Sequence, residues 1–194
     1  MLSELASRTR DAVNSAIQSG DDVLLNLRRA VTSNITGLMD DAGSIARTGI
    51  DTLSEVVQGS LAGAQGVGTS AIDATAAVVQ GAITAVSKTG GDAVQATQSV
   101  VRGAVLGASE TGQDIGKAAT TAINSAAEVA GQVGHSVTDL TRRAIAGVLQ
   151  AGADIAGQAG GNARSAALAT VALPRELVEA LVGNNEQTRV RPEA

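Results

Sequence analysis

The apolar and polar residues of this chain follow a period of eleven. When the sequence is written in rows of eleven, 20 of the 22 charges in residues 12–165 fall in columns 3, 4, 7, 10 and 11. Of the 37 Val, Ile, Leu and Met residues in the same stretch, 33 fall in columns 1, 2, 5, 6 and 9. Eleven residues make three helical turns, at about 98° per residue, so each set covers one side of an α-helix. The pattern predicts a long amphipathic helix, and we call its apolar side the apolar stripe.

The elevens also pair into a repeat of twenty-two residues. The clearest copies are 56–59, 78–81 and 100–103, which read Val-Val-Gln-Gly twice and then Val-Val-Arg-Gly. A solenoid of short helices needs a turn in each repeat, whereas here the apolar phase continues through every repeat boundary. We therefore expect an all-α chain that forms one continuous hendecad-repeat helix, or the same helix folded back into a hairpin or bundle.

Two places favour a bend in this helix. The first is Thr89-Gly90-Gly91-Asp92, which has the order of a helix C-cap followed by an N-cap. The second, weaker one is Gly160-Gly161-Asn162. Nothing before Pro174 prevents a continuous helix, because it is the first proline of the chain.

The chain divides simply around the repeats. Residues 1–11 form a charged lead-in, and 12–173 form the repeat array. A short closing helix is expected over 174–183, with Pro174 in its first turn and Gly183 at its end, followed by a polar, disordered tail at 184–194.

Glycine makes the free helix weak. The repeat array holds 22 of the 23 glycines, and at about 0.8–1.0 kcal/mol each relative to Ala this sums to roughly 20 kcal/mol. An isolated helix with this composition is expected to be largely disordered in water. A lipid surface or another helix must bury the stripe for the helix to form.

Composition excludes several classes of protein. The chain has no Phe, Trp, Tyr or Cys, which argues against a densely packed aromatic core, disulfides and thiolate metal sites. The longest charge-free run, 56–72, is too short and too polar to cross a bilayer. Early charges such as Glu4 and Arg8 argue against a secretory signal. We expect a cytoplasmic protein, peripheral at a lipid or membrane surface.

Several segments resemble the eleven-residue repeats of perilipins. They are 48–52 (Thr-Gly-Ile-Asp-Thr), 87–94 (Ser-Lys-Thr-Gly-Gly-Asp-Ala-Val) and 103–105 (Gly-Ala-Val). α-Synuclein and the exchangeable apolipoproteins use related repeats of eleven or twenty-two. The resemblance extends over residues 12–165 and rests on period and composition. It implies a chain that is disordered in solution and folds into a long amphipathic helix on the surface of a lipid droplet.

Charge narrows the choice of surface. Residues 12–165 carry 9 positive and 13 negative side chains, so the basic face and stacking aromatics that nucleic-acid binding requires are missing. The polybasic face that strong binding to anionic lipid requires is missing too. The predicted function is a non-enzymatic coat on a lipid droplet or peripheral membrane surface. The residues expected to insert among acyl chains are large aliphatics of the stripe: Val56, Val57, Leu61, Val78, Val79, Ile83, Val100, Val101 and Val105.

Small residues support an alternative. Glycines lie four residues apart in the pairs Gly59 and Gly63, Gly103 and Gly107, Gly112 and Gly116, and Gly157 and Gly161. Such pairs let helix backbones approach closely, which favours a homo-oligomeric bundle, a fibre or a hairpin. A desiccation protectant similar to late-embryogenesis proteins, which share the eleven-residue period, is a further alternative.

Catalysis has little support in the sequence. The one histidine, His135, falls in a polar column and is expected to be a solvated surface residue. The glycine-rich segment 63–68 lacks the following Lys-Ser/Thr of a phosphate-binding loop. We expect no catalytic residues, no metal site and no cofactor.

Overall fold

The fold is known from a computed structural model, which describes residues 10–11, 23–42, 48–65, 70–155 and 157–170. These residues form α-helices and turns and contain no β-strand, so the prediction of an all-α chain is confirmed for them. The helices are α2 (Val23–Ala42), α3 (Thr48–Gln65), α4 (Ala71–Lys88), α5 (Ala93–Glu110), α6 (Ile115–Ala130), α7 (Val137–Asp154) and α8 (Gln158–Thr170).

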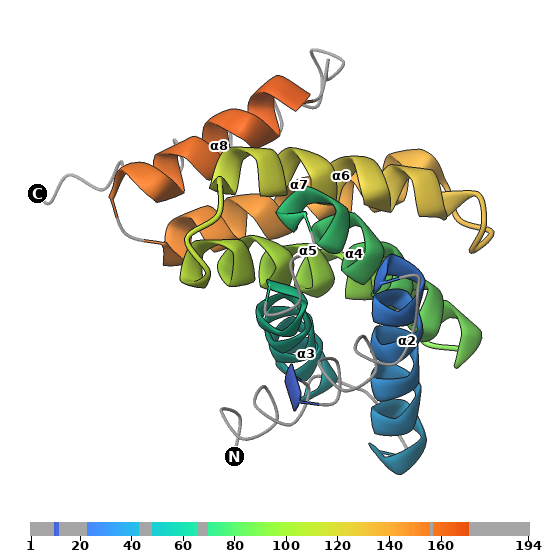
Figure 1. Cartoon of the computed structure of the whole chain (residues 1–194). Coiled ribbons are helices and arrows are strands. Elements are labelled where there is room, and N and C mark those ends of the chain that lie inside the picture. The colour runs from blue at the N-terminus through green and yellow to red at the C-terminus, as the bar shows by residue number, and fades with distance from the viewer. Residues whose placement is uncertain (1–9, 12–22, 43–47, 66–69, 156, 171–194) are drawn as a thin grey trace, which may run out of the picture.

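The helices stack in two layers. Helices two positions apart in the chain pack extensively against each other, so α2, α4, α6 and α8 form one layer and α3, α5 and α7 form the other. Consecutive helices pack across the boundary between the layers. In Figure 1, α2 and α8 lie at opposite ends of this stack.

The prediction of one continuous helix is wrong. The chain turns at 89–92, 111–114 and 131–136, so each repeat from α4 to α6 is one helix followed by one turn. The bend predicted at 89–92 is confirmed, whereas the bend predicted at 160–162 is wrong, because these residues lie inside α8. The folded bundle, which was the alternative, agrees with the observed arrangement.

A glycine lies in each of these turns, and an aspartate that caps the next helix follows it in two of them. Gly90, Gly112 and Gly134 have φ angles of 76°, 70° and 73°, a left-handed conformation that side chains with a Cβ avoid. After Gly90, the N–H of Gly91 donates to the carbonyl of Val86, which closes the preceding helix as a Schellman motif. Two residues after Gly90, Asp92 begins the next helix by accepting a hydrogen bond from the N–H of Gln95 at 2.9 Å.

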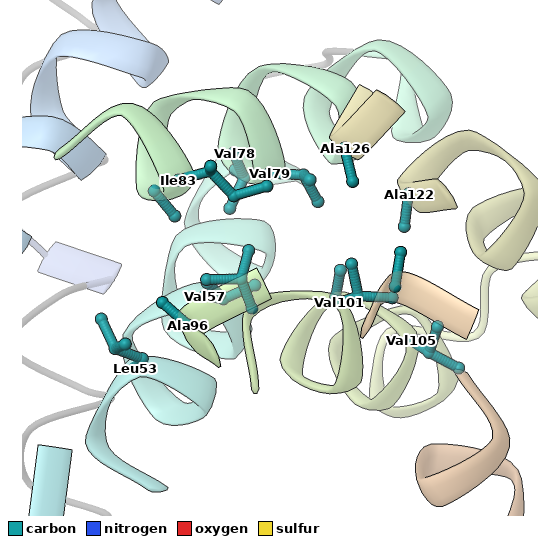
Figure 2. Packing of buried hydrophobic residues seen from close by; sticks show 14 of the residues in the cluster. Leu53, Val57, Val78, Val79, Ile83, Ala96, Val101, Val105, Ala122 and Ala126 are labelled. Atoms are coloured by element: carbon teal, nitrogen blue, oxygen red, sulfur yellow. The ribbon is translucent and has the colours of Figure 1, made fainter. Parts of the chain in front are cut away.

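Small aliphatic side chains fill the space between the layers. Figure 2 shows Val78 and Val79 on the α4 side facing Val57, and Ala122 and Ala126 of α6 facing Val101. Among the described residues, 18 of the 37 buried apolar side chains are alanine, so the helices approach one another closely.

Hydroxyl groups enter this core without remaining unpaired. Thr75 and Thr97 are fully buried, and each donates to the carbonyl four residues earlier, at 2.8 and 2.7 Å. Ser60 does the same with the carbonyl of Val56 at 2.7 Å. Because a partner is always available within the same helix, threonine and serine are tolerated in the stripe.

Three predicted parts of the chain lie outside the described residues. They are most of the charged lead-in, of which only Arg10 and Asp11 are described, the closing helix at 174–183, and the tail at 184–194.

Candidate functional site

The nine residues predicted to insert into lipid are all in the intramolecular core. Val56, Val57 and Leu61 come from α3, the next three from α4 and the last three from α5, and every one is fully buried. Figure 2 shows Val79, Ile83 and Val105 among the side chains of this core. The structure therefore brings all nine residues into one cluster, where other helices of the same chain cover them. In this folded state they offer no surface to a lipid.

Glycines at one repeat position make the stacking contacts. A Cβ at Gly81 of α4 would lie 3.1 Å from the carbonyl oxygen of Arg28 in α2. A Cβ at Gly103 of α5 would lie 2.8 Å from the Cα of Ser54 in α3, and closer still to its carbonyl oxygen. At Gly103 the neighbouring backbone leaves no room for a side chain, whereas at Gly81 a Cβ would fit only if Arg28 moved by a few tenths of an ångström.

The same contact recurs further along the stack. A Cβ at Gly147 of α7 would lie 3.1 Å from the backbone nitrogen of Arg102 in α5, and closer to the carbonyl oxygen of Gln98. Gly107 makes a looser contact, in which a Cβ would lie 3.2 Å from the Cα of Gln58. The predicted close approach through Gly103 and Gly107 is therefore observed within one chain. In contrast, Gly112 and Gly157 have positive φ angles and serve turns.

Polar side chains link neighbouring helices of each layer on the exposed side. In the first layer, Arg28 of α2 donates to Gln80 of α4, and Gln80 donates to Glu128 of α6 at 3.0 Å. In the second layer, Arg102 of α5 pairs with Asp154 of α7 at 2.8 Å. Such exposed pairs contribute little stability, at about 0–1 kcal/mol each. They align the helices of a layer rather than hold them together.

A second polar contact in this layer joins residues at the same sequence separation as Arg102 and Asp154. Gln98 of α5 donates through its side-chain amide to the amide oxygen of Gln150 of α7 at 3.2 Å. Gln98 and Gln150 are fifty-two residues apart, as are Arg102 and Asp154. The spacing of these contacts shows that the two helices run in the same direction with a fixed register.

A shallow groove lies between the N-terminal halves of α2 and α4. It has a volume of about 340 Å³, and its lining includes Leu24, Leu25, Arg28 and Asp73. Leu24 and Leu25 are 37% and 42% exposed, and together they form the most apolar part of this surface. The groove mixes apolar and charged groups and contains no arrangement of side chains suited to a reaction.

The described titratable residues form no reactive cluster. His135 is exposed in the turn before α7, as expected for a surface residue. Within the described part of the chain, no group of three or more His, Cys, Asp or Glu side chains could hold a metal ion. The pKa of Asp114 lies below its ordinary value of 3.8, mainly because the backbone N–H of Lys117 donates to its carboxylate, with a smaller effect of the Lys117 charge. This is the electrostatics of a helix N-cap rather than of a reaction site.

No protein-family model matches the chain, and no curated protein matches it. The resemblance to perilipin repeats therefore stays a prediction from period and composition. Of the helices that the structure describes, none combines the length and apolarity needed to cross a membrane.

A sequence signal marks the three turns after α4, α5 and α6, and the bend predicted at 89–92 rests on one copy of it. The order Gly, any residue, then Asp or Ser occurs at Gly90, Gly112 and Gly134, twenty-two residues apart. These glycines occupy column 2 in every second row of eleven, where the alternate rows have a valine or isoleucine such as Val101. A turn in each repeat could have been predicted from this alternation.

Proposed function

We propose that this protein is a non-enzymatic structural protein, in which the apolar stripe holds successive repeats of the same chain together. The observation that carries the proposal is the complete burial of the nine stripe residues within one chain. A stripe that is already covered by its own repeats gains little from transfer to a lipid surface, because the water has been removed from it on folding. The repeats then act as stacked building units with a polar exterior.

Glycine supports this interpretation further. The roughly 20 kcal/mol of helix-propensity cost is unexplained in an isolated helix on lipid, where alanine would serve equally well at most positions. In the stack, Gly103 and Gly147 meet the backbone of another helix at a distance that excludes a Cβ, and Gly81 makes a tight contact of the same kind. Glycine at these positions is therefore suited to helix stacking.

A lipid-surface coat is the second candidate. It is favoured by the high share of alanine in the core, because each buried alanine contributes less than the about 1.5–3 kcal/mol of a buried Val, Leu or Ile. A weakly held stack can open, and opening its turns would place the helices end to end with the stripe in phase. In this form the chain would coat a lipid droplet or a peripheral membrane surface, as perilipin-type repeats do.

Circular dichroism of the pure protein distinguishes the two candidates. A structural stack predicts high helicity in lipid-free buffer, a cooperative thermal transition, and little change when an oil emulsion or neutral vesicles with packing defects are added. Low helicity in buffer that rises strongly with lipid would contradict the stack and support the lipid coat.

Thiol labelling tests at a single residue whether the core is formed in lipid-free buffer. The chain has no cysteine, so Val79→Cys introduces a unique label in the core, and Thr138→Cys provides an exposed control on α7. In lipid-free buffer, the stack predicts that a maleimide reacts with position 138 and not with position 79. Equal reactivity at the two positions would show that the core is not formed.

A further inference from the structure

The first described helices of the two layers differ in how far they are covered. α2 begins the first layer, and its Gly37 is exposed, with no atom within 4 Å of the position that a Cβ would take. α3 begins the second layer, yet its Gly59 and Gly63 are both buried. Among the described helices, the first layer is therefore open at its beginning, whereas the second layer is covered there.

The burial of α3 is that of a helix with neighbours on both sides. Residues 56–64 of α3 lie two repeats before residues 100–108 of α5, and the two stretches are buried and half-buried at the same nine positions. α5 lies between α3 and α7 in its own layer and also packs on α4 and α6. The described helices that pack on α3 are α2, α4 and α5. A neighbour equivalent to the one that α3 provides for α5 is therefore not among them.

Gly59 and Gly63 lie on the side of α3 that faces away from α5. Two repeats later, Gly103 and Gly107 are the glycines through which α5 packs on α3. α3 receives α5 on a different side, at the backbone of Ser54. The glycine side of α3 is thus turned toward the place of a helix two positions before it in the chain.

The N-terminal segment, residues 1–22, has the length and the pattern of that helix. It precedes α2 and is one repeat of twenty-two residues long. Residues 10–11 are its described part, and they are α-helical and exposed, in agreement with their polar columns. Val13 and Ile17 follow in columns 2 and 6, which are apolar columns of the stripe. The segment therefore has one apolar side to bury.

The register of the stack says which residues would meet. Gly103 and Gly147 each lie against the carbonyl of the residue forty-nine positions earlier in the chain. Forty-nine positions before Gly59 is Arg10, which is one of the two described helical residues of the segment. The same step therefore places Gly59 against the backbone of Arg10, while the long side chain of Arg10 extends into solvent.

We propose that the face of α3 around Gly59 and Gly63 is the docking surface of the N-terminal segment, which packs there as the first helix of the second layer. This inference rests on the proposed structural function, because it extends the contacts of the folded stack by one helix. Docking buries the apolar side of the segment and completes the cover of α3, so that the apolar stripe is enclosed at this end of the layer.

Cross-linking of paired cysteines measures the contact in the full chain, which has no cysteine of its own. Gln98 contacts Gln150 in the step from α5 to α7, and four repeats earlier the equivalent pair is Arg10 and Ala62. A short bismaleimide should therefore link Arg10→Cys to Ala62→Cys within one chain, as it should link Gln98→Cys to Gln150→Cys. Arg10→Cys with the exposed Thr138→Cys of α7 is the control pair that should stay unlinked.

The pattern of links separates the docking from the stack. If the pair at 98 and 150 is linked but the pair at 10 and 62 is not, the docking is wrong and the structural stack stands. If neither pair is linked, the stack is contradicted and the docking with it. A link from position 10 of one chain to position 62 of another, found as a covalent dimer, would make a second copy the occupant and would also overturn the proposal.

Two adjacent substitutions test which side of the segment is buried. The equivalents of Ile17 and Gln18 two repeats later are Leu61, which is fully buried, and Ala62, which is half-buried on the outer side. Ile17→Asp should therefore lower the thermal midpoint by at least about 5 °C through the loss of a buried aliphatic group. Gln18→Asp should leave the midpoint unchanged. An unchanged midpoint for Ile17→Asp, or an equal loss for both variants, would refute the docking.

Discussion

Substituting alanine for glycine should have opposite effects at two positions of the stack. At Gly103, the new Cβ would lie 2.8 Å and 3.0 Å from the Cα and carbonyl carbon of Ser54, and closer to its carbonyl oxygen. All three atoms are backbone, so a side-chain rotation cannot relieve the overlap, and α3 and α5 must move apart. At Gly37 no atom lies within 4 Å of the new Cβ.

The expected change in the free energy of unfolding is the sum of two opposing effects. Alanine gains about 0.8–1.0 kcal/mol of helix propensity over glycine at either position. Forcing an extra group into a packed contact costs about 1–3 kcal/mol, and a clash with three backbone atoms belongs at the upper end of that range. Gly103→Ala should therefore lower the free energy of unfolding by about 2 kcal/mol, whereas Gly37→Ala should raise it by about 1 kcal/mol.

Thermal unfolding followed by circular dichroism measures both effects. For a chain of this size, about 1 kcal/mol corresponds to roughly 2–4 °C, so the two variants should differ by roughly 6–12 °C in their midpoints. Urea unfolding at one temperature provides an independent value. If both substitutions stabilise the protein equally, α5 does not pack on α3 at this glycine, and the stacked arrangement is refuted.

Three further predictions concern the turns. Gly90→Ala should destabilise the protein by about 1–2 kcal/mol, because its φ of 76° is left-handed; an unchanged urea midpoint would contradict the turn. Asp92→Ala should cost about 1 kcal/mol of stability by removing the cap of α5, whereas Asp92→Asn should be nearly neutral. For Asp114, whose pKa is lowered on folding, the stabilisation is present above its ordinary value of 3.8 and is lost as the pH falls through the lowered pKa. Asp114→Asn, which can still cap α6, should therefore flatten the fall in the thermal midpoint between about pH 5 and pH 2, and an unchanged pH profile would contradict that role.

The helical class and the buried face followed from the sequence by itself. The period of eleven places Val57, Val79 and Val101 on one side of any helix that contains them, whatever that side contacts. Helix geometry is a local property, so the positions of the apolar side chains around the axis can be predicted without knowing the partner. The cap at Thr89 to Asp92 was predictable for the same reason, since capping depends on residues within one turn.

The path of the chain was decided by tertiary structure. A repeat of twenty-two residues contains two periods of eleven, so the phase of the stripe is the same whether the helix continues or turns back at Gly112 and Gly134. Each turn gives up the helical hydrogen bonds of a few residues, and this loss is recovered only when the stripe of one helix meets those of its neighbours. That gain depends on close approach at Gly81 and Gly103, which is a contact between residues about fifty positions apart. The sequence by itself therefore determined which face is apolar, and only the packing of distant helices decided that this face is buried within the chain, because burial depends on which surfaces meet in space.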